Sequence, residues 1–346
     1  MDFAALLTDD RIMVFKKDEG IVLNEPAVVA CTQILPKRPI KPKKEKEVDE
    51  TEPKKEVIIK EPPLRVLAVG NEAKKLREND SSVIIKRPID DGRVVNAKFA
   101  ASLFKTLFKK VNGGAARSCL VCTPCSLTPS ELACYKTAVF GGGVSDVVFV
   151  PAVIVQATTT PQLSIVIDDG GADVAVISGK QIVGGGTVEA GTGEAARQLQ
   201  TFIQKRHGVF ITETAAKEVI REIGTLLLND EAEFTISGTD IETEESRDVV
   251  IKGEDCRKIL QPLYDTVAAA AMQILGDIDV ETGDEVRVNG AIVGGFGSAI
   301  MGLREFFTAA LKMPVILTPD SLNSVIIGAG QLLTNDDLIR KIVKAN

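Results

Sequence analysis

The stretch Ser164–Ser178, SIVIDDGGADVAVIS, constrains the fold more than any other segment of the sequence. Two apolar runs, Ile165–Ile167 and Val174–Ile177, enclose two aspartates and two glycines at 168–171. Apolar runs joined by so short an Asp/Gly segment are typical of a tight β-hairpin between core strands. The segment has two interpretations. It is simply a turn, or its glycine amides approach a phosphate while Asp168 holds a water or Mg²⁺ beside it.

Length and composition indicate a globular protein of two domains, since 346 residues can build two cores. The net charge of -7 argues against a general nucleic-acid binder. No apolar run approaches the roughly 18 residues that span a bilayer, and the N-terminus lacks the pattern of a signal peptide. We therefore expect a cytoplasmic protein that binds no nucleic acid.

Three cysteines have the C-x2-C-x2-C spacing of an iron–sulfur motif: Cys119, Cys122 and Cys125. However, residues 118–123 are expected to form a buried strand, on which side chains three apart point to opposite faces. Cys134 falls in a helical segment, so a fourth ligand is not evident nearby. We expect buried, reduced thiols and no metal cluster.

Hydrophobic periodicity predicts strands alternating with helices, which favours an α/β layer structure. The strand Cys119–Thr123, for example, leads to a helix predicted over Ser126–Phe140. Thr128 is the expected N-cap of this helix, with Glu131 at the capping-box position.

Three predictions concern the second half of the chain. Lys180–Val188 is expected to form a strand pair with a glycine bend, and Thr214–Leu228 a helix. A long helix is expected over Glu254–Leu275, broken or bent near Pro262.

Residues 37–56 interrupt this pattern with eight basic and six acidic side chains and several prolines. Such a segment cannot bury enough apolar surface to offset the entropy lost on ordering. We interpret it as a flexible loop inserted in a domain, with a binding site for a charged partner as the alternative.

Two further glycine turns lie where anions commonly bind. Glu189–Glu194 opens a helix predicted over Ala195–His207, and Gly294–Ser298 separates the strand Ala291–Val293 from a helix that runs to Leu311. Free amides and the helix dipole both favour an anion at such N-termini.

Together, the three glycine turns resemble those of the actin, Hsp70 and sugar-kinase superfamily, in which two α/β domains close over a nucleotide. Within it, the chain resembles the MreB-like bacterial actins over nearly its whole length except the charged insert. The resemblance rests on GIVLNEPAVVA (Gly20–Ala30), AVGNEAKKL (Ala68–Leu76), RPIDDGRV (Arg87–Val94), EIG (Glu222–Gly224) and ILQPL (Ile259–Leu263).

The resemblance implies an α/β, actin-like two-domain fold, with two ribonuclease-H-like domains whose subdomains face a central cleft. Domain I would comprise 1–155 plus 322–346, with the flexible charged insert at 36–63. Domain II would comprise 156–321, with a smaller subdomain at about 190–252. The implied cofactor is ATP or ADP with Mg²⁺. Its contacts would be Thr8, Asp168, Gly170, Gly171, Gly191, Lys217, Gly294, Gly295 and Gly297, with Asp168 also serving the metal.

Four departures from the family pattern weaken the case for that cofactor. The first phosphate loop, D-x-G-T in the family, is here Ala5-Leu6-Leu7-Thr8, and the second is about two residues shorter and lacks its threonine. The acidic pair that positions the attacking water falls at Pro151-Ala152. The glutamate and lysine offered to the nucleoside fall at Lys217 and Ile220. We expect a retained fold with hydrolysis lost or very weak.

Three functional hypotheses follow. The first is a filament or scaffold protein involved in cell shape or positioning, partnered by itself or by companion actin-like filaments. The second is an active ATP-dependent filament protein, in which Asp9 or Asp10 replaces the missing acid. The third is a monomeric adaptor that binds through the charged insert. The loop 113–118 carries no large apolar side chain, so we expect membrane contact only weakly or through a partner.

Overall fold

The computed structural model describes residues 1–34, 63–113 and 118–345, and the expected insert at 36–63 lies outside them except for Pro63. A first five-stranded sheet has the order β10-β9-β1-β2-β3. β1 pairs antiparallel with β2 and parallel with β9. The strands are β1 (Phe3–Leu7), β2 (Arg11–Lys16), β3 (Gly20–Pro26), β9 (Ser118–Thr123) and β10 (Asp146–Pro151).

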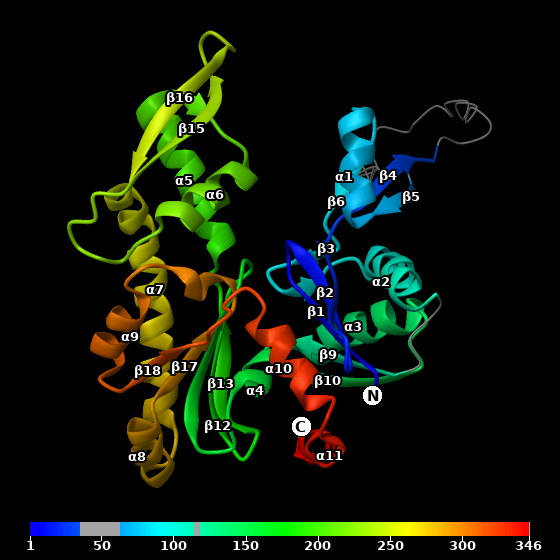
Figure 1. Ribbon diagram of the computed structural model, residues 1–346, viewed down its shortest axis with the longest axis vertical. Helices are drawn as coiled ribbons and strands as arrows, with labels where there is room; N and C mark the ends of the chain where they lie inside the picture. The colour runs from blue at the N-terminus through cyan, green and yellow to red at the C-terminus, as the bar shows by residue number, and fades with distance from the viewer. Residues whose placement is uncertain (35–62, 114–117, 346) are drawn as a thin grey trace, which may run out of the picture.

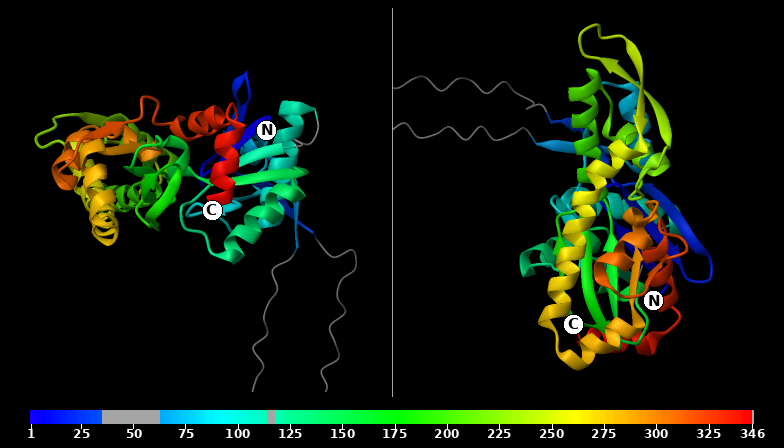
Figure 2. Two further views of the ribbon diagram at one scale, coloured as in Figure 1. Left: turned by 90° about the horizontal axis from the view of Figure 1, so that it is seen from below. Right: turned by 90° about the vertical axis from the view of Figure 1, so that its left-hand side faces the viewer.

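Both faces of this sheet are covered by helices. Phe3, Ala5 and Leu7 of β1 belong to one buried cluster, and Ala4 and Leu6 to another, because successive strand residues alternate in direction. The first cluster packs under α2 (Ala97–Asn112) and α3 (Pro129–Gly141), and the second under α4 (Ala152–Gln156), α10 (Ser324–Leu332) and α11 (Asp336–Ala345). In Figure 2, α11 lies beside the first sheet near the N-terminus.

A second five-stranded sheet has the order β13-β12-β11-β17-β18. The expected central hairpin is confirmed, since β11 pairs antiparallel with β12 around residues 168–171. The strands are β11 (Gln162–Ile167), β12 (Ala172–Ser178), β13 (Gln181–Val188), β17 (Ala291–Gly294) and β18 (Val315–Leu317). Its outer helices are α7 (Gly253–Asp277), α8 (Val280–Asn289) and α9 (Leu303–Leu311).

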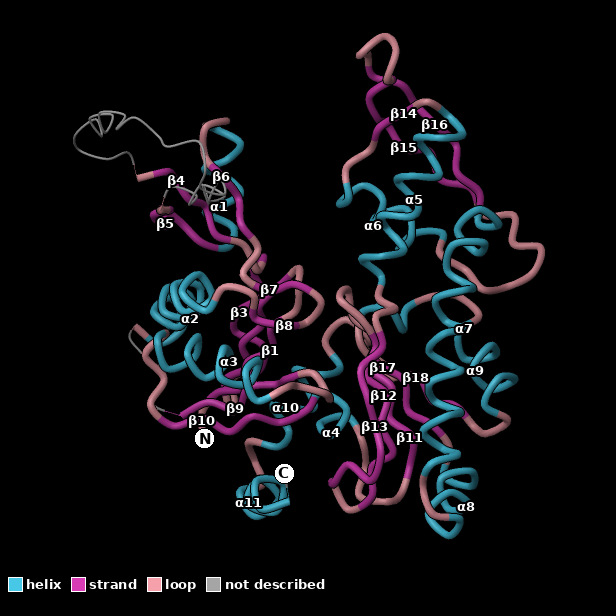
Figure 3. The backbone as a smooth tube through the Cα atoms, turned by 180° about the vertical axis from the view of Figure 1, so that it is seen from behind, coloured by secondary structure: helices cyan, strands magenta, loops and turns pink. Residues whose placement is uncertain are grey.

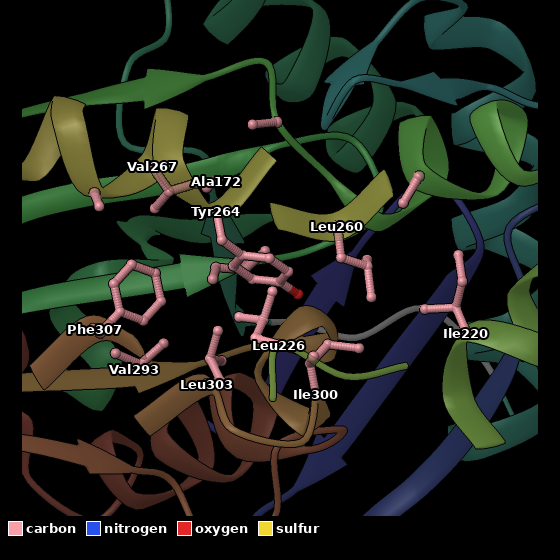
Figure 4. Packing of buried hydrophobic residues seen from close by; sticks show 14 of the residues in the cluster. Ala172, Ile220, Leu226, Leu260, Tyr264, Val267, Val293, Ile300, Leu303 and Phe307 are labelled. Carbon is pink, nitrogen blue, oxygen red and sulfur yellow. The ribbon is translucent and has the colours of Figure 1, made fainter. Parts of the chain in front are cut away.

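The outer face of the second sheet carries the largest core. Figure 4 shows Tyr264 of α7 among Val293, Leu303 and Phe307. The Tyr264 hydroxyl donates to the carbonyl of Gly297 at 2.7 Å, which ties α7 to the loop after β17. The inner face of the sheet shares its cluster with α4, α10 and the first sheet. The two halves of the molecule therefore meet through a common apolar layer.

Two smaller units lie at the same end of the molecule, one beyond each large sheet (Figures 1 and 3). One combines β4 (Val29–Gln33), β5 (Leu64–Val69), β6 (Ile84–Lys86) and α1 (Gly70–Asn79). The other combines β14 (Val209–Phe210), β15 (Glu233–Asp240), β16 (Ser246–Lys252), α5 (Thr192–His207) and α6 (Glu213–Ile223). A short hairpin of β7 (Ile89–Asp90) and β8 (Arg93–Val94) follows β6.

Several local predictions are confirmed and others are wrong. The Thr128–Glu131 capping box forms at the start of α3. The predicted strand pair over Lys180–Val188 is instead one strand, β13, because residues on both sides of Val183 pair with β12; the register shifts at Val183, which has no partner in β12. The helix predicted to reach Leu228 ends at Ile223, because Leu226 instead donates its N–H to the Met301 carbonyl at 2.8 Å.

Two further helices differ in part from the predictions, since the alternative of a break at Pro262 is wrong. α7 continues through Pro262 without a break, with Leu260 and Tyr264 buried on either side of it. The segment after β17 is a 3₁₀ helix (Phe296–Ala299) and then α9, separated at Gly302, whose φ is +79. In the described residues, no helix is long and apolar enough to cross a membrane.

Candidate functional site

The glycine turns predicted from the sequence converge where the two large sheets meet. The second loop, 168–171, lies at the centre and contacts the β7–β8 turn of the other half. An added Cβ at Gly170 would lie 2.6 Å from the Cα of Asp91, so only glycine allows this approach. An added Cβ at Gly171 would likewise lie 2.6 Å from the Val188 carbonyl oxygen.

Asp168, the expected Mg²⁺ ligand, points into the junction between the loops. Its carboxylate accepts a hydrogen bond from the Phe296 amide at 3.1 Å. Burial raises the pKa of Asp168, the Phe296 amide opposes this, and nearby Asp9 raises it further. This carboxylate oxygen is therefore hydrogen-bonded to the third loop, Gly294–Ser298.

The backbone amides at the start of α5 also donate hydrogen bonds within the protein. The Thr192 amide donates to the Asp168 carbonyl at 3.1 Å, and the Gly193 amide donates to the Asp169 carbonyl at 3.0 Å. An added Cβ at Gly191 would lie 2.2 Å from that Asp169 carbonyl oxygen. The helix N-terminus expected to receive a phosphate thus bonds to the second loop.

The third loop is packed equally closely. Gly295 has a φ of +83, and its amide donates to the Ser324 hydroxyl at 3.1 Å. An added Cβ at Gly294 would lie 2.3 Å from Oε1 of Gln156, and one at Gly297 would lie 2.5 Å from the Ile167 side chain. These glycines are required for packing in this arrangement.

The first loop is a tight turn between β1 and β2. The Thr8 amide donates to the Arg11 carbonyl at 2.9 Å, and the Thr8 hydroxyl donates to the same oxygen at 3.3 Å. The Asp9 carboxylate accepts from the amides of Asp91 and Gly92, each at 2.8 Å. The Arg11 guanidinium lies over the Phe296 ring, 4.8 Å from its centroid, and so reaches the third loop.

Lys217 on α6 is the main cation of the site. Its ammonium pairs with Asp10, with Asp169 at 3.4 Å and with Glu213 at 3.1 Å. Burial favours a lower pKa for Lys217, but these carboxylates outweigh it and raise the pKa. Burial raises the pKa of Asp169 to about 7, with Lys217 opposing and Asp10 reinforcing the increase.

A cavity of about 50 Å³ lies beside these loops, lined by Thr8, Asp9, Asp168, Gly170 and Gly171 among others. Ala152 also lines this cavity and carries no acid, and the preceding Pro151 ends β10. At these two positions, no side chain can orient an attacking water.

Two further cavities lie along α6. The larger, about 620 Å³, is lined from both halves by residues that include Asp10, Arg87, Glu213 and Lys217. A smaller apolar cavity of about 30 Å³ is lined by Ile220, Phe296, Ala299, Ile300 and Leu322, with Thr192, Lys217 and Arg221 at its edge.

The structure brings the predicted residues together around the second loop and adds others that the sequence analysis missed. Gln156, Glu213 and Phe296 contact this region, although none was singled out. A weak signal existed for Glu213, which lies one helical turn before Lys217. Phe296 lies inside the predicted third loop, but its sequence does not indicate that its amide binds Asp168.

The cysteines confirm the predicted strand geometry. Cys119 belongs to the buried cluster on one face of the first sheet and Cys122 to the cluster on the other. Burial raises the pKa of the Cys122 thiol to about 12 and that of Cys119 further. Such thiols are poor metal ligands, because a ligating thiol must lose its proton.

Comparison with known proteins places the chain in a family. The family model "MreB/Mbl protein" matches residues 44–341. The cell shape-determining protein Mbl of Bacillus subtilis is 25% identical over 344 residues, covering 96% of this chain and 95% of Mbl. The cell shape-determining protein MreB of Escherichia coli K12 is 24% identical over 351 residues, covering 97% and 94%.

Solved structures agree in fold. MreB5 of Spiroplasma citri bound to ADP has a TM-score of 0.79 and 20% identity, covering 99% of this chain and 98% of that one. The MamK double helical filament has a TM-score of 0.74 and 16% identity, covering 96% and 99%. Both large sheets and both smaller units described above are thus parts of an actin-like two-domain fold, and the chain belongs to the MreB/Mbl family.

Proposed function

We propose that this chain is a filament-forming scaffold protein that acts in cell shape or positioning and has lost nucleotide hydrolysis. The names of its relatives, cell shape-determining proteins, support the first part, as does the likeness to the MamK filament. A head-to-tail contact between identical subunits is heterologous, and so extends into an open filament.

The loss of hydrolysis is supported by one observation above the others: the groups that would face a nucleotide bond to one another. The amides of Thr192, Gly193 and Phe296 donate to the second loop. Triphosphate binding needs oriented free donors and an acid for the hydrated metal. Breaking these hydrogen bonds costs free energy, and this cost lowers the affinity for a nucleotide.

The two acids that could replace the missing first-loop aspartate already have partners within the protein. Both oxygens of Asp9 accept backbone amides, and Asp10 pairs with Lys217. Although burial raises it, hydrogen bonds with Asp169 and Lys217 hold the pKa of Asp10 below its usual range. Asp10 is therefore a counter-ion of Lys217 rather than a free metal ligand.

We propose that any binding of ATP or ADP with Mg²⁺ is weak. The nucleotides bound to MreB5 make such binding plausible for the fold. We assign Thr8, Asp168, Gly170, Gly171, Gly191, Lys217, Gly294, Gly295 and Gly297 to that site, with Asp168 nearest to any metal.

We further propose a cytoplasmic location, with the chain itself or companion actin-like filaments as partners. The expected domains, 1–155 plus 322–346 and 156–321, are proposed as the two rigid halves. This division is supported by the shared apolar layer at α4 and α10, where the chain passes between the sheets.

The test combines sedimentation, electron microscopy and phosphate release on purified protein with ATP, with ADP and without nucleotide. We expect filaments in all three conditions and phosphate release no faster than in a protein-free blank. The diagnostic variant is Asp168→Ala, which should release no more and no less phosphate than the parent.

The scaffold role and the loss of hydrolysis would be contradicted by different results. Stoichiometric phosphate release on assembly, abolished by Asp168→Ala, would restore the active ATPase. Absence of filaments under every condition would refute the scaffold and favour the monomeric adaptor.

A further inference from the structure

We infer that a ring of four alternating charges bridges the cleft, and that it holds the two halves together in the place of a bound nucleotide. The inference goes beyond the proposed function, because it concerns what keeps the cleft closed and not whether a reaction takes place. The ring consists of Asp10 and Arg87 from the first half, and Glu213 and Lys217 from α6 in the second.

The ring is closed by four ion pairs. Lys217 pairs with Asp10 and lies 3.1 Å from Glu213. Arg87 lies 3.1 Å from Glu213 and 3.9 Å from Asp10. Each charge therefore has an opposite charge on both sides. Two of the four pairs, Lys217–Asp10 and Arg87–Glu213, cross from one half to the other.

The geometry of α6 makes the ring possible. Glu213 and Lys217 are four residues apart, so they lie on the same face of the helix. That face is turned toward the β1–β2 turn, which carries Asp10, and toward Arg87 between β6 and β7. A change of residue type at either α6 position would break one crossing pair and one pair within the helix.

Partial burial distinguishes this ring from ordinary surface ion pairs. The exposed fractions of the side chains are 15% for Lys217, 26% for Asp10 and Glu213, and 44% for Arg87. Charges in a network support one another, so the ring contributes more than isolated exposed pairs do. Asp169, which is 3.4 Å from Lys217, adds a carboxylate from beneath the ring.

The location of the ring gives it a role in closure. All four side chains line the cavity of about 620 Å³ between the two halves. In the superfamily that the chain resembles, two domains close over a nucleotide, and here Lys217 and Asp10 already link the two halves. By linkage, a polyanion that competes for Lys217 or Arg87 would open the ring to the extent that it binds.

Two contacts outside the ring reinforce the same closed arrangement. Gly170 of the second half lies against the Asp91 backbone of the first, and Arg11 lies over the Phe296 ring. Both contacts form only when the two halves lie close together. The ring is the part of the interface whose strength can be changed by added salt and by substituting its charged residues.

The test measures the separation of the halves in nucleotide-free protein kept below the concentration at which it assembles. Nitroxide labels are placed through an unnatural amino acid at Lys75 on α1 and Glu242 beyond β15, since the native cysteines would also react with thiol labels. Pulsed electron–electron double resonance then gives the distribution of distances between the two labels. We expect one short distance in the parent protein at low salt.

The variants are Asp10→Asn, Lys217→Gln, their double mutant and Lys217→Glu. Each single neutral variant should lower the closed-to-open ratio about fivefold or more, the low end of couplings between sites. The double mutant should resemble the single variants, because both remove the same pair. Lys217→Glu, which adds a fourth carboxylate beside Asp10, Asp169 and Glu213, should open the cleft furthest.

Lys258→Gln is the matched control, because Lys258 forms an exposed i,i+4 pair with Glu254 on α7 and crosses no interface. It should leave the distance unchanged. A salt titration of the parent protein provides a readout that does not depend on any variant folding. Raising NaCl from roughly 0.05 to 1 M should populate the longer distance, since the Debye length falls to about 3 Å.

The inference is overturned if the parent distance is insensitive to salt, or if folded Lys217→Gln keeps the parent distribution. Additive effects of Asp10→Asn and Lys217→Gln would also overturn it, because two residues that act through one pair cannot add. The measurement uses neither hydrolysis nor filaments, so its failure is separable from failure of the proposed function.

Discussion

The substitution Asp173→Asn should stabilise the protein at neutral pH, and by an amount that grows as the pH rises. Asp173 lies in β12 with 8% of its surface exposed. Its carboxylate accepts a hydrogen bond from the Thr187 hydroxyl at 2.6 Å and another from the Cys125 amide. Burial raises its pKa to about 6 in spite of these bonds.

The magnitude follows from proton linkage. In the unfolded chain the carboxyl has its ordinary pKa of 3.8, so between about pH 4 and 6 the native state retains a proton that the unfolded state has lost. The contribution of Asp173 to stability is therefore full below pH 3.8 and is lost as the pH rises through about 6. The difference between 3.8 and about 6 corresponds to about 3 kcal/mol, since one pKa unit is worth about 1.4 kcal/mol.

The assay is urea unfolding of both proteins at several values from about pH 4 to 8. An asparagine amide oxygen can still accept from Thr187 and Cys125 but never ionises. The unfolding free energy of the variant minus that of the parent should rise by up to about 3 kcal/mol and then level off above about pH 7. Using the difference removes the similar contribution of Asp169, which both proteins share.

Asp146→Asn, at the exposed first residue of β10, is the control for removal of a charge alone. A flat difference for Asp173→Asn, or one that falls with pH, would refute the reasoning. It would mean that hydrogen bonding to the carboxylate outweighs its burial.

Three other predictions use the same unfolding assay or a thiol assay. Thr128→Ala should lower the unfolding free energy by about 1 kcal/mol, because it removes the N-cap of α3. Tyr135→Phe should cost about 1 to 2 kcal/mol, because the Gly92 carbonyl loses the bond that the buried hydroxyl donates at 2.6 Å. A thiol reagent should label Cys125 and Cys134 first, since the other four cysteines are buried; equal labelling of all six in folded protein would contradict this arrangement.

Local sequence determined much of the secondary structure. The continuous apolar runs Ile165–Ile167 and Val174–Ile177, joined by a short Asp/Gly segment, are the signal of the central hairpin, and Thr128 with Glu131 encodes the start of α3. The opposite faces of Cys119 and Cys122 follow from the period of a strand. These features depend on neighbours in the chain, which is why they were predictable.

The wrong predictions share a physical cause. Three leucines at 226–228 extend the apolar pattern of α6 past Gly224 and Thr225, yet the helix ends at Ile223 and Leu226 pairs with Met301, 75 residues further along. Glycines within Lys180–Val188 suggested a strand pair with a bend, but pairing with β12 on both sides of Val183 keeps the segment one strand with a register shift at that residue. In both places a long-range backbone partner outweighed the local preference.

Some features of the candidate site were likewise predictable from the sequence, and others depend on the tertiary structure. The sequence alone supplied the glycine turns, the apolar pair Pro151-Ala152 and the exchange of a family acid for Lys217. Only the tertiary structure decided that Lys217 meets Asp10, which is 207 residues away, and that Arg87 meets Glu213. A charge has no periodicity that indicates its partner, and Coulomb energy depends on the distance that folding sets. The chain therefore determined which charges are present, and the packing of two sheets determined which of them neutralise one another.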